Sequence, residues 1–180
     1  KARNGRTVQK AALAEAVAAN LAQPTSDRRV PVPTTTTRPK VSTRELAKKY
    51  PTIIAINRGG FSLTLYKRLK KVKTYTIAVG QQGLETPAGE YPVVDKQINP
   101  SWHVPNSAWA GELAGRVIPP GPADPLKARW IGITGGAGIH GTDQIGSLGS
   151  AASHGCIRMA IPDVIELFDK TPYGSKIFIH

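Results

Sequence analysis

An alternation of apolar and polar residues around a glycine-containing turn constrains the fold of this chain most. The runs TIIAIN at 52–57 and SLTLYK at 62–67 surround the turn sequence Asn57-Arg58-Gly59-Gly60, and KVKTYTIAVG follows at 71–80. A period of two places successive side chains on opposite faces of a strand, and a short glycine-containing connection between two such runs is typical of a hairpin. The segment therefore predicts a hairpin followed by a third strand.

The rest of residues 51–180 continues this pattern, with one helix near the end. TPAGEYPVVDKQ at 86–97 predicts a turn entering a fourth strand, and RWIGIT, AGIHG and SKIFIH predict further short strands at 129–134, 137–141 and 175–180. IPDVIELFDK at 161–170 predicts a short helix, because Pro162 suits a first helical turn. With 18 glycines and 15 prolines in the chain, we expect a mainly β sandwich or barrel.

Residues 1–50 differ from the rest of the chain in composition and in the spacing of their apolar residues. TVQKAALAEAVAANLA at 7–22 places Leu13, Val17 and Leu21 four residues apart, which predicts a helix. The stretch from 27 to 46 is rich in proline and threonine and predicts an extended linker. We therefore expect residues 1–50 to be the C-terminal part of an upstream domain with its linker, and residues 51–180 to form a second domain.

Two kinds of targeting segment are not expected in this fragment. It contains no apolar run of about 18 residues, the length that a membrane-spanning helix needs. Basic residues at 1–6 followed by alanines imitate a signal peptide, but Glu15 and Asn20 interrupt the apolar stretch. We therefore expect neither a transmembrane segment nor an export signal here.

The positive charge of the chain lies mostly outside its C-terminal part. The formal net charge of +12 divides into +8 for residues 1–50, +6 for residues 51–80 and −2 for residues 81–180. Such a surface attracts polyanions, including the anionic polymers of a bacterial wall, although a solvated charged face is the simpler explanation. Aromatic residues make up only 6% of the chain, which disfavours nucleic acid as a partner.

The single cysteine, Cys156, lies in the sequence SHGCIRM. One cysteine excludes an intrachain disulfide and a zinc site of several cysteines. A nucleophilic thiol needs a base and donors for the oxyanion. His154 is two residues away and awkwardly placed as a direct base, whereas His140 can approach from a neighbouring strand. An imidazole that titrates near neutrality suits this proton transfer, and an imidazolium would lower the pKa of the thiol.

The neighbours of Cys156 strengthen this interpretation without excluding simpler ones. Gly155 lets the backbone approach an acyl group closely, and Arg158 is a planar donor suited to a carboxylate. Taken alone, however, a cysteine is most often a small buried apolar residue, a His-Gly pair is most often a turn, and an arginine is most often in a surface ion pair. Metal binding by the cysteine and the two histidines lacks a fourth ligand, so no metal is expected.

Two longer motifs carry a resemblance to a known family. IHGT at 139–142 and IGSLGSAASHGCIRM at 145–159 resemble the signature of the L,D-transpeptidase (YkuD-type) catalytic domain, in which His-Gly and a glycine-rich loop precede Ser/Thr-His-Gly-Cys. TPAGEYPV at 86–93 and NPSWHVP at 99–105 are similar to further segments of that family. The resemblance covers residues 52–180, and its loop between the two motifs is short.

The resemblance implies a site and a reaction. Cys156 would be the nucleophile and His140 its general base, oriented by the carbonyl of Gly141. Backbone groups of residues 154–156 would form the oxyanion hole, His154 and Ser153 would shape the site, and Arg158 would bind substrate. The family joins peptidoglycan stem peptides through a thioester, with loss of the terminal D-alanine and formation of 3→3 crosslinks. It needs no metal or other cofactor and acts outside the cytoplasm of bacteria.

Some alternatives stay open at this point. Residues 1–50 resemble the end of a peptidoglycan-binding module. Water or a free D-amino acid could resolve the thioester, which would give an L,D-carboxypeptidase or an exchange enzyme, and a non-catalytic wall-binding protein is a further alternative. Trp102, His103 and Trp109 lie in an expected long loop, where they either line the substrate groove or cap the core.

Overall fold

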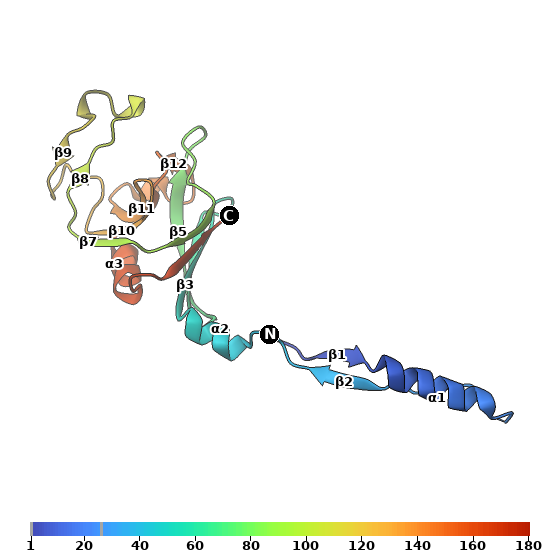
Figure 1. Cartoon of the computed structure of the whole chain (residues 1–180). Helices are drawn as coiled ribbons and strands as arrows, with labels where there is room; N and C mark the ends of the chain where they lie inside the picture. Colours follow the sequence, from blue (N-terminus) through green and yellow to red (C-terminus); the bar gives the residue numbers. More distant parts are fainter. Residues whose placement is uncertain (1, 26) are drawn as a thin grey trace. The chain divides into compact units, whose positions relative to one another are not determined.

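The computed structural model describes residues 2–25 and 27–180 and divides the chain into two compact units. The first unit ends at Leu46, and the second runs from Ala47 to His180 (Figure 1). Among the described residues, no helix is both long and apolar enough to cross a membrane. Each unit is built around its own strands.

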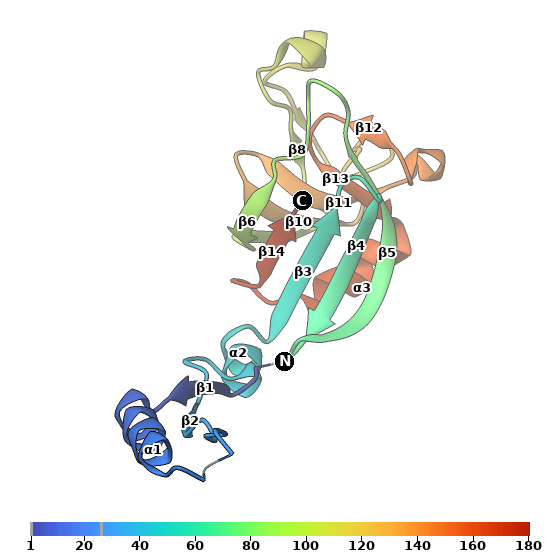
Figure 2. The same cartoon turned by 90° about the vertical axis from the view of Figure 1, so that its right-hand side faces the viewer.

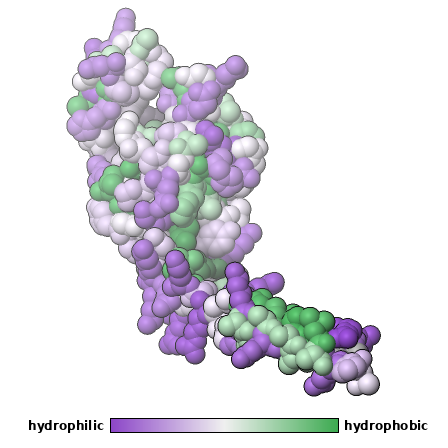
Figure 3. Space-filling model, turned by 45° about the vertical axis from the view of Figure 1, so that its right-hand side comes forward, coloured by the Kyte–Doolittle hydropathy of each residue, from purple (hydrophilic) through white to green (hydrophobic). Residues whose placement is uncertain are grey.

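The first unit combines one antiparallel pair of strands with one helix between them in sequence. Strand β1 (Gly5–Val8) pairs antiparallel with β2 (Thr34–Thr37), and helix α1 (Lys10–Ala22) lies between them in sequence. The helix confirms most of the one expected at 7–22. None of its residues is buried, and the apolar side chains of Val17 and Leu21 are exposed. Figure 3 shows apolar surface gathered on this unit.

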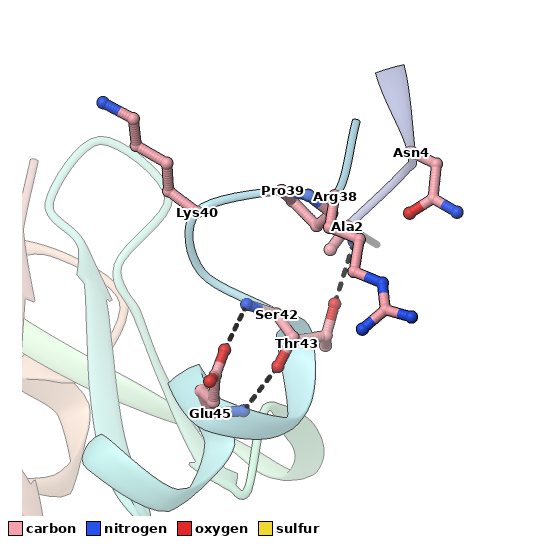
Figure 4. A pocket seen from close by; sticks show the side chains of 8 residues that line it. All are labelled: Ala2, Asn4, Arg38, Pro39, Lys40, Ser42, Thr43 and Glu45. Carbon is pink, nitrogen blue, oxygen red and sulfur yellow. Dashed lines mark hydrogen bonds between the residues drawn. The ribbon is translucent and has the colours of Figure 1, made fainter. Parts of the chain in front are cut away.

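A second helix occupies part of the segment that we expected to be an extended linker. Helix α2 (Thr43–Lys49) begins after Ser42, whose Oγ accepts a hydrogen bond from the Glu45 backbone N–H at 3.1 Å. The Glu45 carboxylate accepts one from the Ser42 N–H at 2.7 Å (Figure 4). This reciprocal pair is a capping box, which satisfies two N–H groups that a helix start leaves without partners.

The second unit is dominated by a ten-stranded mixed sheet. Its strands follow the order β6, β14, β3, β4, β5, β13, β11, β10 and β7, and β12 pairs with β5 off this path. Figure 2 shows β14, β3, β4 and β5 side by side in this sheet. The strands are β3 (Thr52–Asn57), β4 (Ser62–Lys67), β5 (Lys70–Gly80), β6 (Gly89–Pro92), β7 (Asp95–Ile98), β10 (Arg129–Thr134), β11 (Ala137–Thr142), β12 (Ala151–Ser153), β13 (Ile157–Ala160) and β14 (Lys176–Ile179). A mainly β fold is confirmed.

The predicted hairpin is present, and its alternation explains the core. Strands β3 and β4 pair antiparallel from Thr52–Lys67 to Asn57–Ser62, and β5 continues the sheet next to β4. Ile54 and Leu65 face each other in this register, and both are fully buried. They join the inward-facing residues of the other strands in one apolar cluster, which stabilises the sheet by removing its apolar face from water.

The predicted late helix covers part of the sheet. Helix α3 (Ile161–Lys170) follows β13 directly, carries a proline in its first turn and packs against β10, β11 and β13. Its buried residues are Val164, Leu167 and Phe168, which share one face of the helix. Because α3 packs on the core face of these three strands, it stabilises the part of the sheet from which the site is built.

The segment containing Trp102 is more ordered than a simple loop. Strand β8 (Trp102–His103) pairs antiparallel with β9 (Val117–Ile118), and a 3₁₀ segment, η1 (Ala108–Leu113), lies between them. A pairing of two residues on each side is too short to show as a periodic pattern in sequence, which explains why we expected a long loop.

Candidate active site

Two parallel strands bring the motif residues together. Strands β11 and β13 pair with Ile139 opposite Ile157 and His140 opposite Arg158. Both isoleucines are fully buried in the core, so the alternating neighbours point to the other face of the sheet. Cys156 comes directly before β13. His140, Cys156 and Arg158 all line one cleft of about 980 Å³.

The thiol of Cys156 is half-buried at the wall of this cleft. Its Sγ lies 4.0 Å from the carbonyl oxygen of Gly136, to which the S–H can donate a weak hydrogen bond. Burial raises the pKa of the Cys156 thiol, and the Gly138 backbone N–H and the Arg158 charge only partly oppose this effect. The thiol is therefore protonated at neutral pH.

The imidazole of His140 is buried and lines the same cleft. Nδ1 lies 2.7 Å from the carbonyl oxygen of Gly141, so the neutral ring carries its hydrogen on Nδ1 and its lone pair on Nε2. Burial lowers the pKa of His140 to about 4, and the Arg158 charge adds to this effect. Backbone hydrogen bonds with Gly141 and Pro125 oppose it only partly. This differs from the imidazole titrating near neutrality that we expected, because sequence does not reveal burial.

The turn before Cys156 is held by its own hydrogen bonds. The buried Ser153 hydroxyl donates to the carbonyl of Cys156 at 2.5 Å and accepts from the Gly155 N–H at 3.2 Å. Gly155 has a φ of +109°, a conformation that only glycine adopts readily. A side chain at this position would therefore strain the turn that presents the thiol.

Aromatic rings form another wall of the cleft. The Trp109 ring stacks on the His154 ring with centroids 4.2 Å apart and an angle of 1° between their planes. Trp102 lies 6.4 Å from Trp109 at 14°, and His103 is exposed at the rim. All four side chains line the cleft, and none of them belongs to the apolar cluster of the core.

Arg158 is held by a residue that we did not identify from sequence. Its Nη1 donates to the side-chain oxygen of Gln144 at 3.0 Å. Gln144 follows β11 and belongs to no motif, so only the three-dimensional proximity of the two segments reveals the contact. The bond fixes the guanidinium, which lines the cleft.

Trp130 is a second residue that sequence reasoning missed. It lies on β10, lines the cleft, and its ring is 6.2 Å from that of His140 at an angle of 23°. Ile131 and Ile133 of the same strand are buried in the core. Their alternation with Trp130 was a usable signal, because a period of two places the tryptophan on the opposite face.

We expect Gly138→Ala to displace Trp130 and to destabilise the fold. A methyl group on Gly138 would lie 2.4 Å from the Trp130 ring, which is too close for contact. Overpacking of this kind costs about 1–3 kcal/mol, measurable as a lower free energy of unfolding in urea. Gly146→Ala is the matched control, since its methyl group would meet no atom within 4 Å. Equal stability of the two variants would contradict the prediction.

The described residues contain no cluster of three or more His, Cys, Asp or Glu side chains that could hold a metal ion. The cleft instead combines one thiol, one buried imidazole, one guanidinium and an aromatic wall. Such a set suits nucleophilic acyl transfer, with the thiol as nucleophile and the imidazole as proton acceptor.

Comparison with known proteins identifies the family of this chain. Residues 51–179 match the YkuD family, the L,D-transpeptidase catalytic domain. A Bacillus licheniformis protein named as L,D-transpeptidase YkuD is 37% identical over 130 residues, which cover 72% of this chain and 66% of that protein. The chain thus spans about two thirds of the length of this relative.

Solved structures share the fold. An L,D-transpeptidase from Mycobacterium smegmatis superposes with a TM-score of 0.60 at 15% identity, covering 84% of this chain and 64% of that chain. The transpeptidase LdtMt1, solved in complex with imipenem, gives a TM-score of 0.60 at 17% identity and covers 83% of this chain and 63% of its own. With the match over residues 51–179, the chain belongs to the L,D-transpeptidase (YkuD) catalytic-domain family.

Proposed function

We propose that this protein crosslinks peptidoglycan stem peptides outside the cytoplasm, with Cys156 as nucleophile and His140 as general base. The observation that supports this most is the parallel pairing of β11 and β13, which brings the two residues to the same cleft. The family acts on such stems. Residues 1–50 remain a predicted end of a peptidoglycan-binding module.

In the first half-reaction, Nε2 of His140 accepts the proton of the Cys156 thiol as sulfur attacks the carbonyl carbon of the third, diamino-acid residue of the donor stem. The C–N bond to the terminal D-alanine breaks, and the imidazolium protonates the departing amine. A thioester remains on Cys156. Because both groups are neutral at pH 7, proton transfer accompanies attack, and no preformed thiolate is required.

In the second half-reaction, the amine of another stem attacks the thioester carbon. It gives a proton to Nε2 of His140 as the new amide forms, the C–S bond breaks, and the sulfur regains its hydrogen from the imidazolium. The product is a 3→3 crosslink, and the enzyme returns to its starting state. Water in place of the amine gives hydrolysis, so the shape of the cleft and its affinity for amines decide the outcome.

The surrounding residues have defined roles in this proposal. The Gly155 N–H is engaged with Ser153, so the amides of His154 and Cys156 are the donors for the oxyanion. Arg158, fixed by Gln144, binds a substrate carboxylate. Trp102 and His103 line the substrate groove.

Imipenem tests the proposal directly. We expect the protein to gain the mass of one imipenem molecule, because the thiol opens the β-lactam ring by the same attack on a carbonyl carbon. Intact-protein mass spectrometry followed by peptide mapping should place the adduct on Cys156. An unmodified protein, or an adduct elsewhere, would contradict the proposal. Muropeptide analysis by mass spectrometry then separates crosslinked dimers from hydrolysed or exchanged stems.

A further inference from the structure

One wall of the cleft is formed by the segment between β5 and β6, residues 81–88. Leu84, Glu85 and Pro87 of this segment line the cleft. The Gln81 N–H donates to the carbonyl of Ser153 at 2.9 Å, which ties the segment to the turn that presents the nucleophile. This hydrogen bond therefore links the wall to the turn that contains Cys156.

Further contacts hold this wall in place. Arg58 donates from Nη1 to the carbonyl oxygen of Thr86 at 2.7 Å, and the Thr86 hydroxyl accepts a hydrogen bond from the Gly80 N–H at 2.9 Å. A side chain on Gly80 would lie 2.1 Å from the Leu84 carbonyl oxygen, so the chain passes too closely for any other residue. These contacts therefore hold the backbone of residues 84 and 85 in place.

Two carbonyl oxygens of this wall approach the catalytic turn. A methyl group built on Gly155 would lie 3.6 Å from the carbonyl oxygen of Leu84 and 3.9 Å from that of Glu85. Within residues 2–25 and 27–180, no backbone N–H donates to either oxygen. Both are hydrogen-bond acceptors beside the residue that precedes Cys156.

Charge distinguishes this wall from the rest of the cleft. Among the described residues that line the cleft, Glu85 has the only carboxylate and Arg158 the only guanidinium. The Glu85 carboxylate accepts a hydrogen bond from the Gly83 N–H at 2.8 Å. That bond, together with the Glu85 N–H and the nearby positive charge of Arg58, lowers the pKa of Glu85, so the side chain is ionised at neutral pH.

We infer that the Glu85 carboxylate and the carbonyl oxygens of Leu84 and Glu85 form an ammonium-binding subsite for the side-chain amine of the stem's diamino acid. This inference rests on the proposed function and deepens it. A primary ammonium has three N–H donors, which match one carboxylate and two carbonyl oxygens. The amine can belong to the donor stem, where it takes no part in the reaction, or to the acceptor stem, where the bound ammonium loses one proton to solvent before its nitrogen attacks the thioester.

The test compares Glu85→Gln with the wild-type protein. Glutamine keeps the size of the side chain and an oxygen for the Gly83 N–H, and it removes the charge. Two ratios are measured by mass spectrometry of the products. The first is the acylation rate with a tetrapeptide donor whose side-chain amine is free, divided by the rate with the N-acetylated donor. The second is transfer to a stem amine divided by transfer to hydroxylamine, which is uncharged at neutral pH.

We expect Glu85→Gln to lower one of these ratios by about 5- to 10-fold, the range for a charge-assisted hydrogen bond that solvent partly screens. A fall in the first ratio assigns the subsite to the donor stem, and a fall in the second assigns it to the acceptor stem. Glu112→Gln is the matched control, because Glu112 is exposed in the same unit and is not among the residues that line the cleft.

Unchanged ratios in Glu85→Gln, or an equal fall in Glu112→Gln, would overturn the subsite. Failure of the proposed function has a different signature, since the wild-type protein would then show neither an imipenem adduct nor acylation by either donor. Each ratio compares a charged with an uncharged partner in the same protein sample. A loss of folded protein lowers both rates by the same factor and therefore leaves the ratio unchanged.

Discussion

Replacement of Cys156 with alanine is expected to reduce crosslinking by roughly 10⁴- to 10⁶-fold, the loss that follows removal of a covalent nucleophile. The chain has no other cysteine, so no second thiol can form the thioester. The imipenem adduct should disappear in the same variant. Product formation is measured from muropeptides by mass spectrometry, and adduct formation from the mass of the intact protein.

The fold should tolerate this substitution, which makes its kinetic effect interpretable. Cys156 is half-buried at the cleft rather than in the apolar cluster, so its sulfur contributes little packing. We expect the thermal midpoint of Cys156→Ala to stay close to that of the wild-type protein. Crosslinking at near wild-type rates by a folded Cys156→Ala protein would exclude Cys156 as the nucleophile.

The parts of the fold that sequence predicted correctly are those with a local cause. The 52–67 hairpin follows from alternation around a turn, and the helix at 161–170 follows from a proline in its first turn and one apolar face. Each signal lies within one short segment, of 16 residues for the hairpin and 10 residues for the helix. They were therefore readable without knowledge of what the elements pack against.

Other features depend on contacts between distant segments and left no such signal. Gln144 holds Arg158, and the Trp109 ring stacks on the His154 ring across 45 positions of sequence. The site residues were predicted from the resemblance of their motifs to a known family. Neither the motifs nor their spacing indicated that His140 is buried. Burial is a property of the whole packed domain, and it lowers the pKa of His140 below the near-neutral value that we expected.

The lowered pKa of His140 leads to a test of its role as a base. We expect His140→Asn to lower the acylation rate by about 10²- to 10⁴-fold, the usual contribution of a general base. Asparagine can still donate a hydrogen bond to the Gly141 carbonyl, so the variant removes the base while preserving that contact. His180→Asn is the control, because His180 is exposed at the last position of the chain.

The pH dependence of acylation separates this mechanism from a preformed thiolate–imidazolium pair. Because burial lowers the pKa of His140 to about 4, the ring accepts a proton throughout the range from pH 5 to 8. The wild-type rate should therefore rise through about pH 4, stay nearly level to neutrality, and rise again as the thiol with its raised pKa ionises. In His140→Asn the lower step should vanish and only the alkaline rise remain.

The lowered pKa of His140 also makes the stability of the fold depend on pH. The direction of this dependence must be known before the pH–rate profile is interpreted. The unfolded chain binds a proton at His140 below its ordinary value of 6.5, whereas the folded protein does so only near 4. The contribution of neutral His140 to stability is thus complete above pH 6.5 and is lost as pH falls toward 4. Rates near the lower step are therefore measured together with circular dichroism of the same samples. A single step near pH 6.5, with the fold intact, would show that His140 titrates as an exposed imidazole and would exclude proton transfer between two neutral groups.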